Sequence, residues 1–166
     1  PTSAADVLAG LGGKIPLVID GGDTDVGIES TIIGIRDNKL YLLRPGTITA
    51  DEISDAAGET VLDRDEQEIT APGQLASHYA PRAHVRMNAD TARTGEILIG
   101  FGAVAGRYSL SPAGDLAEAA HKLFKLLRIA DTDGIQTIAV APIPNQGIGI
   151  AINDRLRRAA APREAI

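Results

Sequence analysis

Residues 71–81 read APGQLASHYAP and separate two halves of the chain in which apolar residues follow clearer patterns. Pro72 and Pro81 disfavour helix at both ends of this stretch, because proline lacks an N–H group and restricts the residue before it. Between them, His78 stands next to Tyr79. An imidazole beside a phenol offers two hydrogen-bonding groups and a flat surface, which suit a planar polar ligand. An ordinary linker, with Tyr79 packed and His78 solvated, is the alternative.

Composition limits the possible classes of protein. The 166 residues suffice for one ordinary domain or two small ones, and 44% of them are apolar but only 3% aromatic, so the core must consist of aliphatic side chains. The net charge of −6 argues against a broad basic surface for nucleic acid. The chain has no cysteine and no apolar run near the roughly 20 residues of a membrane helix. We expect a soluble, cytoplasmic protein without a membrane partner.

The first half predicts short helices and strands. The turn signal Asp37-Asn38 joins two strands into a hairpin. Thr49 and Glu52 have the spacing of a capping box, which starts a short helix that Gly58 ends. The β-branched run 17–19 predicts a buried strand. The expected elements are helix 2–11, strand 17–19, a glycine-rich turn at 20–23, hairpin strands 27–35 and 40–43, helix 50–57 and strand 61–62.

The second half predicts a parallel α/β layer, because strands and helices alternate along it. The longest helix starts at Asp115, and the segment 131–134 ends it. Arg155, Arg157 and Arg158 stand near the C-terminus of the last helix, where the helix dipole favours cations. We expect strands at 85–87, 97–101 and 137–141, with the last helix opening at Gly147. The predicted divisions of the chain are a first unit 1–62, a linker 63–84 and an α/β unit 85–166.

Chemistry is best placed at the open end of the hairpin. Ser30 and Arg44 lie on paired strands and could face one pocket, where an arginine offers a planar fork of donors to phosphate or carboxylate. A surface salt bridge for Arg44 and a backbone contact for Ser30 explain the same residues. The glycines of 101–106 do not have the dinucleotide-binding spacing. The segment Asn145-Gln146-Gly147 before the last helix fits an anion site or simple helix capping equally well. The three histidines lack metal-ligand spacing, so no metal site is expected on the protein.

Several of these pieces resemble the Sua5/YrdC/YciO family in their order along the chain. The matching segments are PTSAADVL (1–8), LVIDGG (17–22), VGIESTII (26–33), LLRPG (42–46), PG (72–73) and SHYAP (77–81). The resemblance implies part of a YrdC-like twisted α/β sheet, followed by the small Rossmann-like parallel α/β domain of Sua5-type members. It also implies an L-threonylcarbamoyladenylate synthase, which joins L-threonine, bicarbonate and ATP into threonylcarbamoyl-AMP and pyrophosphate, with Mg²⁺ on the phosphates. The adenylate would pass to proteins that modify tRNA.

The resemblance also implies roles for individual residues. Ser30 would contact the threonine part of the product, with Thr31 as a weaker candidate neighbour. Arg44 would contact the phosphates, and His78 and Tyr79 would fold over the nucleotide. Catalysis would consist mostly of positioning and charge neutralisation, and no general base is assigned.

The family's Lys-x-Arg and Ser-x-Asn motifs would precede Pro1, so we expect a C-terminal fragment that is inactive alone. Asp23-Thr24-Asp25 stands where the family often has prolines, which would alter only a turn. Two alternative functions remain. One is a nucleotide-sensing module without catalytic activity, motivated by the glycines at 101–106. The other is a module that binds double-stranded RNA, which the acidic net charge disfavours.

Overall fold

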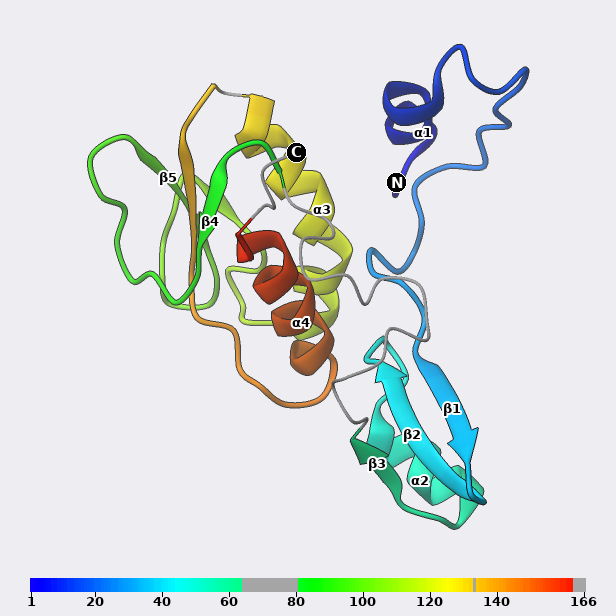
Figure 1. The fold of residues 1–166 in the computed structure, drawn as a ribbon. Helices are drawn as coiled ribbons and strands as arrows, with labels where there is room; N and C mark the ends of the chain where they lie inside the picture. Colours follow the sequence, from blue (N-terminus) through cyan, green and yellow to red (C-terminus); the bar gives the residue numbers. More distant parts are fainter. Residues whose placement is uncertain (64–80, 133, 163–166) are drawn as a thin grey trace.

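The computed structural model describes residues 1–63, 81–132 and 134–162, which form two β-sheets and four helices (Figure 1). The predicted α/β class with a parallel sheet is confirmed. The N-terminal sheet contains β1 (Ile32–Arg36), β2 (Lys39–Arg44) and β3 (Val61–Asp63) in that order. Among the described helices, none is long and apolar enough to cross a membrane. The predicted unit boundaries stay predictions, and most of the linker lies outside the described residues.

Local signals form the N-terminal elements as expected. Asp37 and Asn38 adopt positive φ angles, which turn β1 back antiparallel to β2. Helix α1 (Ala4–Leu11) begins at a capping box on Ser3. Helix α2 (Ala50–Ala57) begins at the predicted capping box on Thr49 and ends at Gly58 in the left-handed conformation.

One strand prediction in this half is wrong, and one predicted strand begins later than expected. Residues 17–19 are not a strand, and Leu17 and Ile19 are 71% and 85% exposed. A strand needs a neighbour to pair with, and the described residues supply none there. The predicted strand 27–35 begins only at Ile32, with a bulge between Ile32 and Ile33. Residues 27–29 pack against the second half of the chain instead.

The C-terminal sheet is parallel and carries its helices on one face. It contains β4 (His84–Arg86), β7 (Thr137–Val140), β5 (Glu96–Gly100) and β6 (Tyr108–Ser109) in that order. Figure 1 shows α3 (Leu116–Thr132) and α4 (Ile148–Ala160) side by side against this sheet. Ile97, Ile99, Ile138 and Val140 form a core with both helices, whereas Leu98 and Ala139 lie on the other face in a small separate cluster. The short strand β6 was missed, whereas α3 ends at Thr132, within the segment 131–134 that was predicted to end it.

Glu96, at the start of β5, is expected to make the stability of the fold depend on pH in the acidic range. Arg86 Nε donates to Glu96 Oε1 at 2.9 Å, and the Arg93 N–H donates to Oε2 at 2.8 Å. These hydrogen bonds, the one from Arg86 first, lower the pKa of Glu96 from 4.5 to about 2. A carboxyl with a lowered pKa in the folded state stabilises the fold above its unfolded pKa and loses that contribution as the pH falls.

We therefore expect Glu96→Gln to lose stability relative to the parent protein at neutral pH, and the difference to shrink as the pH falls from 4.5 towards 2. Urea unfolding at a series of pH values measures this difference. A gap between the two proteins that stayed constant over that range would contradict the role given to Glu96.

Candidate functional site

The structure brings Ser30 and Arg44 into contact at the open end of the hairpin. Arg44 ends β2 and is paired in register with Ile32. Its Nε donates to the Ser30 carbonyl oxygen at 3.0 Å, and its Nη2 lies 3.4 Å from Ser30 Oγ. Arg44 is only 9% exposed, whereas Ser30 is exposed. The guanidinium therefore fixes the backbone of a serine that remains accessible to a ligand.

The turn after β2 packs tightly on the same serine. The Thr31 hydroxyl donates to the Ile48 carbonyl oxygen. A Cβ atom built on Gly46 would lie 2.2 Å from the Thr31 nitrogen and 2.5 Å from the Ser30 carbonyl carbon. Only glycine permits this approach. The segments 29–31 and 44–46, which both carry the resemblance described above, therefore form one packed unit.

Sequence reasoning missed a second arginine behind this unit. The prediction that Arg155 serves the dipole of the last helix is wrong, because its side chain is completely buried and paired. Its Nε donates to Glu29 Oε2 at 2.9 Å, and its Nη1 donates to Asp154 Oδ2 at 2.8 Å. Glu29 directly precedes Ser30. No local pattern points to this pair, because its members are 126 positions apart.

His78 and Tyr79 lie outside the described residues, so their predicted place over the site stays a prediction. The next residue that the structure describes is Pro81, which lines a cavity of about 770 Å³ together with Glu29. Phe124 and Arg128 of α3 and Thr2 near the N-terminus also line this cavity. The residues that follow the His-Tyr pair thus share a cavity with the residue that precedes Ser30.

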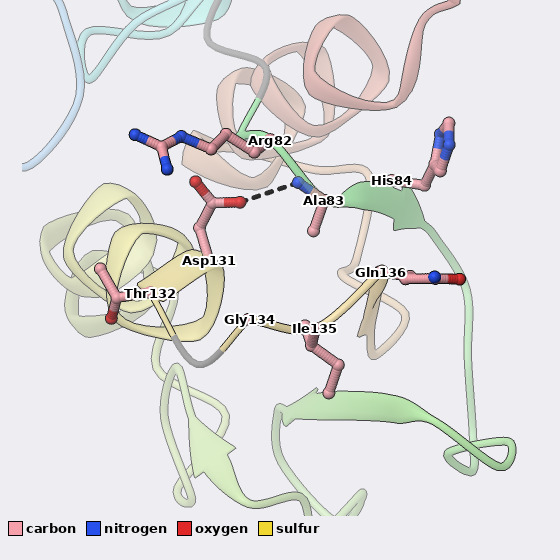
Figure 2. Close-up of a pocket in the computed structure, with 8 residues that line it drawn as sticks. All are labelled: Arg82, Ala83, His84, Asp131, Thr132, Gly134, Ile135 and Gln136. Atoms are coloured by element: carbon pink, nitrogen blue, oxygen red, sulfur yellow. Dashed lines mark hydrogen bonds between the residues drawn. The ribbon is translucent and has the colours of Figure 1, made fainter.

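A second cavity, of about 610 Å³, lies where β4 begins and α3 ends (Figure 2). Asp131 Oδ1 accepts a hydrogen bond from the Ala83 N–H at 2.8 Å, and the Arg82 and His84 side chains point in opposite directions. The Arg82 and His84 side chains therefore do not converge on one point of this cavity. In the part of the chain that the structure describes, no group of three His, Cys, Asp or Glu side chains could hold a metal ion.

The glycines at 100–106 have a packing explanation. A Cβ atom on Gly100 would lie 2.2 Å from the Val104 carbonyl oxygen, and one on Gly106 would lie 2.4 Å from that of Leu98. The loop folds back on β5 through a bridge between Phe101 and Val104. Close packing therefore accounts for Gly106, one of the two glycines that motivated a nucleotide-sensing module in this half.

Residues 48–161 match the protein family described as "Threonylcarbamoyl-AMP synthase, C-terminal domain". The chain belongs to this family. Curated relatives named threonylcarbamoyl-AMP synthase are 32% identical in Pyrococcus abyssi and 30% identical in Bacillus subtilis, each over 98% of this chain and 54% of the relative. A relative of the same name in Schizosaccharomyces pombe is 28% identical over 97% of the chain. The chain spans about half the length of these relatives.

Solved structures resemble the chain as well. The crystal structure of P. abyssi Sua5 complexed with L-threonine superposes with a TM-score of 0.83 at 31% identity, over 96% of this chain and 54% of that one. A second structure is of P. abyssi Sua5 in which a consecutive histidine and tyrosine are replaced by alanine, with a TM-score of 0.75 at 28% identity. The resemblance to the family inferred from the sequence motifs is thereby confirmed.

Proposed function

We propose that this chain is the C-terminal part of a threonylcarbamoyl-AMP synthase and contributes one wall of its active site. The observation that carries the proposal is the similarity to enzymes of that name over 98% of the chain. The contact between Arg44 and Ser30 supports the proposal, because a guanidinium group lies next to an accessible hydroxyl group. The bound L-threonine of the P. abyssi structure supports threonine as a substrate.

The proposed roles follow from the chemistry of these groups. The amino group of threonine takes up bicarbonate as a carbamate with loss of water, and a carbamate oxygen attacks the α-phosphorus of ATP as pyrophosphate leaves. Ser30 holds the threonine part, and Arg44 neutralises phosphate charge. Mg²⁺ enters with the phosphates of ATP as part of the substrate. The adenylate then passes to tRNA-modifying proteins.

His78 and Tyr79 complete the proposed site as a cover over the nucleotide. A consecutive histidine and tyrosine were the residues substituted in the second P. abyssi structure, which are the same two residue types in the same order. Their position in the chain, shortly before Pro81 on the cavity lined by Glu29, is compatible with that role.

Exposed apolar side chains support the proposal that the site needs a further part of the enzyme. Leu8 and Leu11 of α1, Leu17 and Ile19 are exposed by 44% to 85%. Helix α1 buries no residue completely. Apolar surface of this kind commonly marks an interface. We propose that the remaining half of the catalytic domain covers this surface, because the relatives are about twice as long as this chain.

The test compares residues 1–166 with the full-length protein in an assay for threonylcarbamoyl-AMP from L-threonine, bicarbonate, ATP and Mg²⁺. We expect the adenylate and pyrophosphate from the full-length protein and none from residues 1–166. A full-length protein without this activity would overturn the proposed function. Robust turnover by residues 1–166 alone would overturn the proposal that they form only part of the site.

A further inference from the structure

We propose that the C-terminal α/β domain positions Ser30, by holding the three residues before it, and that Glu29 and Arg155 are positioning residues for threonine binding. The proposal rests on the proposed function of Ser30. It assigns a task to the C-terminal domain. Three independent contacts, to Gly27, Ile28 and Glu29 in turn, carry it.

The first contact is a backbone approach at Gly27. A Cβ atom on Gly27 would lie 2.3 Å from the His121 carbonyl oxygen and 2.4 Å from that of Ala120, both on α3. No larger residue allows this distance without moving the segment away from the helix. The next residue, Ile28, is 7% exposed and belongs to the core cluster that α3 and α4 form with the C-terminal sheet. Gly27 and Ile28 are therefore anchored in the C-terminal domain.

The third contact is the ion pair between Glu29 and Arg155. Arg155 is completely buried, and Asp154 binds both Arg155 and Arg158 of the same helix, the latter through Nε at 3.1 Å and Nη2 at 3.0 Å. The two carboxylates and two guanidinium groups balance in charge. A buried charge that loses its partner is strongly destabilising. Glu29 is therefore held in place by Arg155, which Asp154 of α4 holds in turn.

The consequence is that Ser30 is fixed from two sides. On its N-terminal side, the C-terminal domain holds residues 27–29, and from the hairpin Arg44 binds the Ser30 carbonyl oxygen at 3.0 Å. Binding of a ligand at Ser30 then costs the protein less conformational entropy, because the serine is already in place. Other ion pairs also bridge the two halves, but their partners in the first half are not adjacent to Ser30 in the sequence. Lys125, for example, binds Asp23 at 3.5 Å.

The test uses the full-length protein with Glu29→Gln and Arg155→Met, and Lys125→Met as the matched control. Each variant removes one charge from an ion pair between the two halves of the chain. We expect Glu29→Gln and Arg155→Met to raise the KM for L-threonine by about tenfold, since hydrogen bonds to charged groups contribute at about that level. The KM for ATP and the kcat should change less, and Lys125→Met should change none of the three. Arg155→Lys should restore part of the threonine affinity, because it restores the charge without the fork.

Hydrogen exchange of the Ser30 and Thr31 amides gives a readout that does not depend on activity. We expect faster exchange at these amides in Glu29→Gln, with unchanged exchange in Lys125→Met. If Arg155→Met fails to fold, Glu29→Gln decides alone, because the Glu29 side chain is one third exposed and the Arg155–Asp154 pair remains. A folded Glu29→Gln protein with parental threonine KM and parental exchange would overturn the proposal. A parent protein without synthase activity would overturn the proposed function, while the exchange rates would still decide whether the C-terminal domain holds Ser30.

Discussion

Arg44→Met in the full-length protein is expected to lower the kcat/KM for ATP by about a hundredfold, the usual effect of removing a donor that stabilises developing charge. The structure gives two reasons. The guanidinium is nearly buried and donates to the Ser30 carbonyl oxygen, and it is the cation next to the exposed Ser30 hydroxyl. Methionine keeps much of the apolar stem of arginine and removes both the charge and the donors. Steady-state formation of pyrophosphate measures the effect.

A second substitution separates the two roles of Arg44. Arg44→Lys keeps the positive charge but not the planar fork that reaches Ser30. We expect it to recover part of the kcat/KM for ATP that Arg44→Met loses. We also expect the KM for threonine to be raised in both variants, because neither keeps both contacts of Arg44 to Ser30. The control is Arg36→Met, which removes an exposed arginine from the neighbouring strand of the same hairpin. It should change either constant by less than about twofold, as surface substitutions usually do. Activity within threefold of the parent in Arg44→Met would contradict the role given to this residue.

The sequence predicts elements well where the signal is local. The Asp37-Asn38 turn, the capping box on Thr49 and the apolar face of α3 each depend on residues within one or two turns of each other, and the structure confirms all three. It fails at 17–19, where an apolar run has no neighbouring strand among the described residues. It also misses β6, which is only two residues long and is defined by its pairing with β5.

The candidate site divides in the same way. The contact between Ser30 and Arg44 could be predicted, because a hairpin brings residues at its open end together. The pair of Glu29 and Arg155 could not, because nothing in the sequence around either residue depends on the other. The local rule for arginines at a helix C-terminus holds for Arg157 and Arg158 but gave a wrong role to Arg155. The close approaches at Gly27 and Gly46 are contacts between distant segments, so a single sequence marks them only as glycines.

Gly46→Ala is expected to damage both the fold of the hairpin and threonine binding. Its Cβ atom would lie 2.2 Å from the Thr31 nitrogen, 2.5 Å from the Ser30 carbonyl carbon and 2.7 Å from the Glu29 carbonyl oxygen. All three atoms belong to the backbone, so no side-chain rotation relieves the clash, and one of the two segments must move. Overpacking of this kind costs about 1–3 kcal/mol in unfolding free energy.

The same displacement moves Ser30, because the new methyl group would overlap with the backbone of residues 29–31. We therefore expect the affinity of the full-length protein for L-threonine, measured by calorimetry, to fall by about tenfold to a hundredfold. Gly10→Ala is the control, since a Cβ atom there meets nothing within 4 Å and lies inside α1, where alanine is the better helix former. Parental threonine affinity in Gly46→Ala would mean that Ser30 tolerates a shift of its backbone, and its place in the threonine site would have to be given up.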